Sequence, residues 1–317
     1  AAGGTRMKEY AAPAEALADA TRLARAMTYK MAAAALPMGG GKSVLAVPGD
    51  LPDDHREQLL WRHGHNINLL GGNYRTGPDM NTSSADMDVL GQVTPFVFGR
   101  TPAEGGSGSS APDTAVGCLH GIKASLAHVF GTDSLPGRRV LVQGVGEVGR
   151  RLAEMLAKEG ATVLISDVDE GRTTTLAEEL GLDVVPVGDE LETECDVFAP
   201  CAAGGILTAA TIPRLRCRIV AGAANNPLGD PADGARLQQA GILYAPDFVI
   251  NGGGAIHLIG YETLGWSRAQ VEAHLAGIGT TLSEIYQAAV NKGISTEEAA
   301  EQVAEARLAA RPRPAGV

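Results

Sequence analysis

Aromatic residues are scarce in this sequence. The 317 residues include only five Phe, six Tyr and two Trp, or 4% of the chain, whereas 44% of the residues are hydrophobic. The core must therefore be built mainly from aliphatic side chains, as is usual in soluble α/β proteins rich in Ala, Gly, Leu and Val. The length favours two domains over one.

Cysteines are few and carry no recognisable spacing. Cys118, Cys195, Cys201 and Cys217 form no C-x-x-C pair and have no His in ligand register. We therefore predict neither a disulfide framework nor a metal site. The four thiols are interpreted as small hydrophobic residues of a protein in a reducing compartment.

Positive charge and long apolar runs are also lacking. The chain has 26 Lys and Arg against 37 Asp and Glu, a net charge of -11, which argues against nucleic acid and anionic membranes as partners. No segment has the unbroken apolarity of a membrane span, and no signal-like region opens the chain. We expect a cytoplasmic protein with small-molecule partners. Because it opens on Ala1 and resembles the middle of a fold, we expect a fragment without its first strands.

Two lysines surround the stretch that we take as the centre of the protein. Lys30 and Lys42 flank an apolar Met-Ala-Ala-Ala-Ala-Leu run that ends in Gly39, Gly40 and Gly41. Lysine is rarely buried unless its charge is used, so both ammonium groups are candidates for pointing into a pocket. The glycines would let the backbone approach a ligand. A surface hairpin with two solvated lysines is the alternative, and this stretch alone favours neither.

The pattern around the lysines predicts a helix at Pro13–Met31, a short strand at Ser43–Val47 and a second helix at Asp53–Leu69. The first helix ends near Lys30, where the helix dipole offers a purely structural role for a cation. Asp79 follows a Gly-Pro pair and should lie in a tight extended turn. It is either a turn residue or a carboxylate that faces the lysines and completes an acid–base site.

A G-x-G-x-x-G motif at Gly144, Gly146 and Gly149 is the most specific signal. It lies between a predicted strand and a predicted helix, and a second strand follows that ends at Asp167. This context predicts a dinucleotide site in which Gly144 makes the tight turn and Gly146 admits the pyrophosphate. Gly149 would let helix and strand pack closely.

Asp167 bears on which dinucleotide is bound. An acid at the end of the second strand would bind the ribose hydroxyls of the adenosine, and it would repel a 2'-phosphate. Val168, not Arg, follows it. The sequence therefore favours NAD over NADP.

Further βα units are predicted after this point, with strands beginning at residues 184, 196, 219, 242 and 248. Asn225 and Asn251 each follow one of these strands. An open parallel sheet presents its ligand crevice at the strand ends, so both are candidate contacts to nicotinamide or substrate. Two helices are expected at Ser267–Asn291 and Ser295–Arg311.

Taken together, the motifs resemble those of the Glu/Leu/Phe/Val dehydrogenase family, NAD(P)-dependent amino-acid dehydrogenases. The resemblance spans nearly the whole chain. It rests on the segments G-G-T-R from Gly3, M-T-Y-K from Met27, P-M-G-G-G-K from Pro37, G-P-D-M from Gly77, Q-G-V-G-x-V-G from Gln143, A-G-A-A-N-N from Ala221 and A-P-D-F-V-I-N from Ala245. The family's N-terminal portion, which helps to build the subunit interface, is not among them.

The resemblance implies specific roles in oxidative deamination. Lys30 would bind the substrate carboxylate, Lys42 would activate the hydrolytic water, and Asp79 would shuttle protons to and from the substrate nitrogen. Further residues are implied in binding: Gly4, Asn225, Ala2, Gly77, Ala255 and Leu258 for the substrate, and Gly144, Gly146, Glu147, Val148, Gly149, Asp167, Thr114, Ala202, Asn225 and Asn251 for the cofactor.

Three small residues bear on substrate choice. Family members acting on glutamate carry a lysine where this chain has Ala2, so an apolar substrate is implied. Members acting on leucine carry larger residues than Ala2, Gly77 and Ala255, so we expect room for a ring, and the nearest resemblance is to members acting on phenylalanine. Leucine or valine is the alternative. A non-catalytic NAD-binding regulatory protein is the alternative from another class, and its signature would be loss of Lys42 or Asp79.

The expected fold is α/β, with two domains and the active-site cleft between them. A substrate domain with a mixed sheet is predicted at 1–100, joined by C-terminal helices at 288–317. A Rossmann-type, doubly wound NAD-binding domain is predicted at 101–287. The Gly-rich stretch at 99–110 is the candidate connection, and a homo-oligomer is expected.

Overall fold

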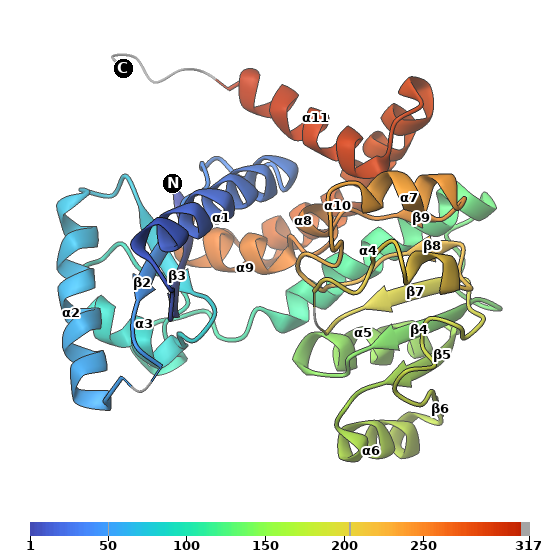
Figure 1. Cartoon of the computed structure of the whole chain (residues 1–317), viewed down its shortest axis with the longest axis horizontal. Helices are drawn as coiled ribbons and strands as arrows, with labels where there is room; N and C mark the ends of the chain where they lie inside the picture. The colour runs from blue at the N-terminus through green and yellow to red at the C-terminus, as the bar shows by residue number, and fades with distance from the viewer. Residues whose placement is uncertain (50, 203, 312–317) are drawn as a thin grey trace. The chain divides into compact units, whose positions relative to one another are not determined.

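The computed structural model describes residues 1–49, 51–202 and 204–311. It divides into two compact α/β units, whose elements Figure 1 labels. The first unit comprises Ala1–Ser110 and Ala255–Val271, and the second comprises Ala111–Gly254 and the chain from Glu272 onward. None of the helices in the described part of the chain is long and apolar enough to cross a membrane.

A three-stranded sheet forms the centre of the first unit. Its order is β2 (Ser43–Ala46), β1 (Ala2–Lys8), β3 (Arg75–Pro78), and both pairs are parallel. The expectation of a mixed sheet was therefore wrong for the described strands. The reason is local: α1 (Pro13–Ala33) and α2 (Asp53–Leu69) each connect one strand to the next, and a crossover helix returns the chain in the same direction.

The side chains of β1 alternate between two apolar clusters. Ala2 packs with Met31 of α1, whereas Met7 packs with Leu60 of α2, and both clusters are buried. The central strand β1 thus contacts α1 through one cluster and α2 through the other; Figure 1 labels its neighbours β2 and β3. The unit is completed by α3 (Ser84–Gly91), a 3-10 turn at Pro102–Glu104, and most of α9 (Gly253–Glu262).

A six-stranded parallel sheet forms the second unit. Its order is β6-β5-β4-β7-β8-β9, the doubly wound order of dinucleotide-binding folds, which confirms the predicted fold class. The strands are β4 (Arg139–Gln143), β5 (Thr162–Ser166), β6 (Asp183–Val184), β7 (Val197–Pro200), β8 (Ile219–Val220) and β9 (Leu243–Tyr244). The helices are α4 (Ala111–Phe130), α5 (Glu147–Lys158), α6 (Glu170–Leu180), α7 (Asp233–Gln239), α8 (Asp247–Ile250), α10 (Arg268–Lys292) and α11 (Thr296–Ala309), with a 3-10 turn at Ile212–Arg214.

The C-terminal helices pack on this second unit. Thr296 Oγ1 donates to the Tyr244 carbonyl of β9 at 2.7 Å, and Gln238 Nε2 of α7 donates to the Ile294 carbonyl at 3.0 Å. The contacts therefore group residues 288–311 with the dinucleotide-binding unit, whereas the sequence analysis joined 288–317 to the substrate domain. Residues 312–317 lie outside the described part.

The segment after β9 differs from the sequence expectation. The run from Phe248 was predicted as a strand, but Asp247–Ile250 form the short helix α8 and α9 follows at Gly253. Pro246 precedes the helix in an extended conformation and Asp247 lies in its first turn. A buried apolar run this short has no periodicity that separates strand from helix.

Candidate active site

An ion pair between Lys42 and Asp79 is the chemical centre of the first unit. Lys42 Nζ lies 2.7 Å from Asp79 Oδ1, and the two side chains are 5% and 22% exposed. Lys42 directly precedes β2 and Asp79 directly follows β3, the two neighbours of β1. Because the strands are parallel and Thr5 of β1 pairs with both Ser43 and Pro78, the two charged side chains meet above Gly4.

Gly4 gives these side chains room. A Cβ at Gly4 would lie 2.7 Å from the Asp79 Cβ and 2.8 Å from the Pro78 carbonyl oxygen, closer than real Cβ atoms approach other atoms. A side chain here would displace Asp79. The implied substrate-site residue Gly4 is therefore required at least for the placement of the carboxylate.

A hydroxyl cluster on the other face of the sheet holds the register. Thr5 Oγ1 hydrogen-bonds Thr76 Oγ1 at 2.7 Å and Ser43 Oγ at 2.8 Å, which ties one residue of each strand together. His63 Nε2 of α2 joins at 3.1 Å from Thr5 Oγ1. Burial lowers the pKa of His63 to about 4, so the imidazole is neutral at physiological pH. The sequence analysis missed this cluster.

The surroundings of the pair shift the pKa values of both groups. Burial lowers the pKa of Lys42, and Asp79 only partly counteracts this effect. Burial opposes ionisation of Asp79, but Lys42 and Arg6 outweigh it and lower the pKa of the carboxyl. A lysine whose pKa is lowered in this way is a candidate general base.

Two of the three glycines between the lysines lie against other parts of the first unit. A Cβ at Gly40 would lie 2.0 Å from the Thr28 backbone nitrogen of α1, and one at Gly41 would lie 2.7 Å from the Tyr74 ring, whereas Gly39 has open space. Gly40 and Gly41 are therefore required by contacts within the first unit, and the expectation that the three glycines allow close approach of a ligand stays a prediction. The surface-hairpin alternative is excluded, because β2 pairs in parallel with β1. Lys30 lies partly buried in the last turn of α1.

Three residues implied in substrate binding share one apolar cluster. Ala2 is fully buried there, and Ala255 and Leu258 pack partly buried against it. The cluster also contains the ring of Phe98. A Cβ at Gly77 would lie 2.1 Å from Phe98 Cε2, so the space over Gly77 is filled by this ring. The expectation that Gly77 leaves room for a substrate ring was therefore wrong.

The G-x-G-x-x-G turn of the second unit has the predicted geometry. Gly144 has φ +90°, a conformation that favours glycine, and its Cβ would lie 2.6 Å from the Cβ of Ala202. A Cβ at Gly149 would lie 1.9 Å from the Gly144 carbonyl oxygen, whereas Gly146 has no atom within 4 Å. Asp167 accepts from the Val145 backbone N–H at 2.7 Å, so its carboxylate lies against the turn.

A cavity of about 700 Å³ opens beside this turn. Its lining includes Gly146, Glu147 and Leu176, and also Arg150 and Arg172, two cations that the sequence analysis had not considered. Both are already paired with carboxylates, Arg172 with Asp169 and Arg150 with Glu154. The open Gly146 and the adjacent cavity fit a dinucleotide pyrophosphate at the N-terminus of α5. Val148 follows Glu147 in the first turn of this helix.

The two candidate asparagines are in direct contact. Asn251 Nδ2 donates to Asn225 Oδ1 at 3.0 Å and to the Ala223 carbonyl at 3.2 Å, although Asn251 follows helix α8 and not a strand. Asn251 Oδ1 is buried without a hydrogen-bond partner. A buried acceptor left unpaired is costly and fits a donor supplied by a ligand, such as a carboxamide. Thr114 lies in the first turn of α4, where a Cβ at Gly253 would approach its Cα to 2.8 Å.

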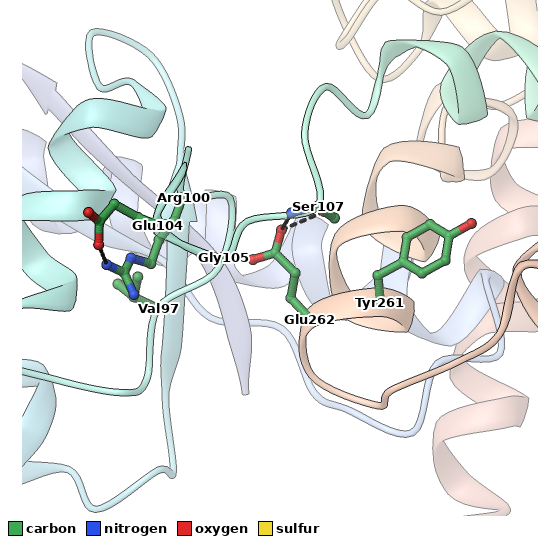
Figure 2. Close-up of a pocket in the computed structure, with 7 residues that line it drawn as sticks. All are labelled: Val97, Arg100, Glu104, Gly105, Ser107, Tyr261 and Glu262. Atoms are coloured by element: carbon green, nitrogen blue, oxygen red, sulfur yellow. Dashed lines mark hydrogen bonds and ion pairs between the residues drawn. The ribbon is translucent and has the colours of Figure 1, made fainter. Parts of the chain in front are cut away.

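A second, polar cavity in the first unit includes none of the predicted site residues. Figure 2 shows its seven lining residues around Glu262, and its volume is about 570 Å³. Glu262 accepts from the backbone N–H groups of Gly99 at 2.7 Å and Ser107 at 2.8 Å. The carboxylate thus anchors the glycine-rich stretch at 99–110 to α9, a function that no local pattern indicated. Among the described residues no group of His, Cys, Asp and Glu could hold a metal ion.

The doubly wound sheet, the glycine-rich turn and the buried lysine–carboxylate pair define a nicotinamide-dinucleotide oxidoreductase. The chain belongs to the Glu/Leu/Phe/Val dehydrogenase family. The protein-family model described as "Glu/Leu/Phe/Val dehydrogenase, dimerisation domain" matches residues 1–95. The family model described as "Glutamate/Leucine/Phenylalanine/Valine dehydrogenase" matches residues 105–187 and 165–316. The protein is thus an amino-acid dehydrogenase, as the motifs had indicated.

Named relatives include enzymes for different amino acids. The chain is 42% identical to a leucine dehydrogenase of Thermoactinomyces intermedius over 97% of its length and 83% of the relative. It is 41% identical to a phenylalanine dehydrogenase of Caldalkalibacillus thermarum over 99% of its length and 85% of the relative. The crystal structure of L-tryptophan dehydrogenase from Nostoc punctiforme superposes with a TM-score of 0.88 and 36% identity, covering 98% of this chain and 88% of that one.

Proposed function

We propose that this protein catalyses the NAD-dependent oxidative deamination of an apolar L-amino acid, with L-phenylalanine as the preferred substrate. The observation that carries the reaction type is the partly buried Lys42–Asp79 pair at 2.7 Å in a member of an amino-acid dehydrogenase family. The products are the 2-oxo acid, here phenylpyruvate, and ammonia. The reaction is reversible.

In this mechanism Lys30 binds the α-carboxylate and Asp79 takes a proton from the substrate ammonium. NAD⁺ bound at the glycine-rich turn supplies the acceptor for the hydride that leaves Cα. Lys42, in its neutral form, then takes a proton from the water that adds to the resulting iminium carbon. Asp79 returns its proton to the nitrogen, and the C–N bond breaks to release ammonia. The hydroxyl of the adduct loses its proton as the carbonyl of the 2-oxo acid forms, and this proton and the one taken up by Lys42 pass to solvent. Burial lowers the pKa of Lys42, which favours the neutral form that takes the proton from water. Against the effect of burial, Lys42 and Arg6 keep Asp79 ionised and therefore able to accept a proton.

The residues of the second unit would hold the cofactor. The turn at Gly144, Gly146 and Gly149 would hold the pyrophosphate, and Thr114 and Asn225 would orient the nicotinamide and the substrate. The preference for NAD rests on Asp167, whose carboxylate at the turn would meet the ribose hydroxyls and repel a 2'-phosphate. Val168 beside it is 85% exposed and offers no positive charge.

The proposal of an apolar substrate rests on the cluster around Ala2. Ala255, Leu258 and Phe98 lie around this alanine, so the side chains that meet here are apolar. Because Phe98 fills the space over Gly77, the preference for phenylalanine now depends on Ala2 and Ala255. Leucine or valine is the second candidate, and the leucine dehydrogenase relative at 42% identity supports it.

A substrate panel tests this proposal. Initial rates of NADH formation with L-phenylalanine, L-leucine, L-valine and L-glutamate are expected to rank phenylalanine first and glutamate last, with NADP a poorer acceptor than NAD. A leucine preference would contradict the phenylalanine assignment but not the reaction type. The absence of turnover with all four would contradict the reaction type itself.

We also propose that the protein is a homo-oligomer. The matched model for residues 1–95 is described as a dimerisation domain. Light scattering of the purified chain is expected to give a mass of at least two copies, and a monomer at micromolar concentration would contradict this. The cytoplasmic location remains a prediction of the sequence.

Substitution of Gly77 should reveal how tightly Phe98 packs. Gly77→Ala is expected to lower the free energy of unfolding by about 1 to 3 kcal/mol, because the added Cβ would lie 2.1 Å from the Phe98 ring. Phe98→Leu in the same chain should restore part of that loss. Urea unfolding of both single variants and the double variant measures the coupling, and strictly additive effects would show that the two residues do not contact.

A further inference from the structure

Arg6 links the Lys42–Asp79 pair to a second carboxylate. From the central strand β1, Arg6 Nε donates to Asp79 Oδ2 at 2.8 Å, the oxygen that Lys42 does not use. Arg6 Nη1 donates to Asp19 Oδ2 of α1 at 3.2 Å. The side chains of Arg6 and Asp19 are each only 14% exposed. The four groups Lys42, Asp79, Arg6 and Asp19 thus form one continuous row of alternating charge.

The proposed reaction requires a neutral Lys42, and Asp79 then needs another cation beside it. When Lys42 is neutral, Asp79 loses the cation at its Oδ1, and a buried carboxylate without a partner charge is unfavourable. The guanidinium of Arg6 cannot be deprotonated in a protein, so it remains a cation at Oδ2 throughout. Lys42 can then release its proton without leaving Asp79 unpaired.

We propose that Arg6 is a positioning residue that holds Asp79 in place, and ionised until it accepts the substrate proton, when Lys42 is neutral, and that Asp19 sets how strongly Arg6 acts. This inference rests on the proposed function, in which neutral Lys42 and ionised Asp79 do the proton transfers. Arg6 itself touches no reacting atom. Its part is to hold Asp79 and to favour the neutral form of Lys42.

Several other polar and charged groups lie around this row. Tyr10 Oη donates to Asp19 at 2.7 Å, and burial together with this bond raises the pKa of Tyr10 to about 12. Burial opposes ionisation of Asp19, but the bonds from Tyr10, Arg22 and Arg6 lower its pKa to about 2. Arg22 on α1 pairs with Asp19 Oδ1 and is 58% exposed. Tyr74, which also senses the charge of Asp79, has a raised pKa because it is buried.

Arg6 and Asp19 act on Lys42 with opposite sign. Burial has the largest effect on the pKa of Lys42; beyond it, the charge of Arg6 lowers this pKa and the charge of Asp19 raises it. Arg6 also lowers the pKa of Asp79. Removing Arg6 should therefore raise both values, whereas removing the charge of Asp19 should lower that of Lys42. General loss of structure would not produce shifts in opposite directions.

The experiment measures kcat/KM for oxidative deamination from about pH 6 to about pH 10, the range in which general bases work. Its rising limb reports the loss of the proton from Lys42. Arg6→Gln is expected to move this limb to higher pH by about one unit, because it removes a like charge that disfavours the ammonium form of Lys42. The loss of rate should then be about tenfold near neutral pH and smaller on the alkaline side.

Asp19→Asn keeps an acceptor oxygen for Arg6 and removes the charge, and it should move the limb to lower pH. Arg22→Gln is the matched control, because it removes an exposed arginine from the same carboxylate, and its limb should not move. The inference would be overturned if the rising limb of the pH profile stayed in place in both Arg6→Gln and Asp19→Asn. It would also be overturned if the limb moved in the same direction in both variants. If Arg6→Gln fails to fold, the direction of the shift in Asp19→Asn alone decides.

The outcomes separate this inference from the proposed function. If the wild-type chain turns over an amino acid but the rising limb of kcat/KM lies at the same pH in Arg6→Gln and Asp19→Asn, the role of Arg6 is contradicted. The proposed reaction is then unaffected. A wild-type chain with no turnover on any amino acid overturns the proposed function, and the inference with it.

Discussion

Replacing Lys42 by alanine is expected to lower kcat for oxidative deamination by about 10²- to 10⁴-fold, the usual contribution of a general acid–base group. The side chain of Lys42 is 5% exposed, its ammonium group contacts Asp79, and burial lowers its pKa. Without it, water at the reacting carbon has no positioned base. Single-turnover and steady-state rates at saturating substrate measure the loss.

The fold should survive this substitution. Asp79 keeps its 2.8 Å contact with Arg6, so removal of Lys42 does not leave the carboxylate without a cation. Lys8→Ala is the matched control, because Lys8 is an exposed lysine at the end of β1 whose ammonium lies 5.1 Å from the Tyr10 ring. Normal turnover in Lys42→Ala, with the control also unchanged, would contradict the mechanism proposed for this site.

The substitutions Gly149→Ala and Gly146→Ala are expected to have different effects on the second unit. In Gly149→Ala the new Cβ would lie 1.9 Å from the Gly144 carbonyl oxygen. Because the Cβ position is set by its own backbone and its partner is a backbone atom, no rotamer change relieves the overlap. Helix α5 must move away from β4. We expect a loss of about 3 kcal/mol, the upper part of the range for overpacking, and a fall in the melting temperature of roughly 6 to 12 °C.

Gly146→Ala is the matched substitution within the same motif. Its Cβ would meet no atom within 4 Å and its φ of -66° suits any residue, so stability should change by less than about 0.5 kcal/mol. The methyl group would instead stand where the pyrophosphate approaches the N-terminus of α5. NAD affinity should therefore fall by about tenfold, the equivalent of one lost hydrogen bond. Calorimetric titration with NAD and thermal melts of both variants test the contrast, and equal melting temperatures would refute it.

Local patterns predicted most of the elements correctly. The helix at Asp53–Leu69 has the expected bounds, and the strand–turn–helix around the glycine motif is where its context placed it. These segments are long or carry turn chemistry that few other structures share. The prediction was wrong at Phe248, where a short buried run was assigned to a strand and forms α8, because burial hides the periodicity that separates the two.

The candidate site was only partly predictable, because its partners are far apart in the chain. Lys42 and Asp79 were paired through the expected chemistry and the structure brings them together, but Arg6 was noticed only as the last residue of a motif. Arg6 and Asp79 are 73 positions apart, and their contact depends on β1 lying between β2 and β3. No local spacing encodes that order of strands.

The sequence by itself determined the class of fold, the dinucleotide turn and the identity of the charged residues, since these depend on periodicity, glycine conformation and residue type within short windows. The tertiary structure decided which charges share a site and which space is filled. Phe98 occupies the room over Gly77, and Arg6 takes the second oxygen of Asp79. Both contacts arise from packing between distant segments, where side-chain volume and the register of parallel strands act together.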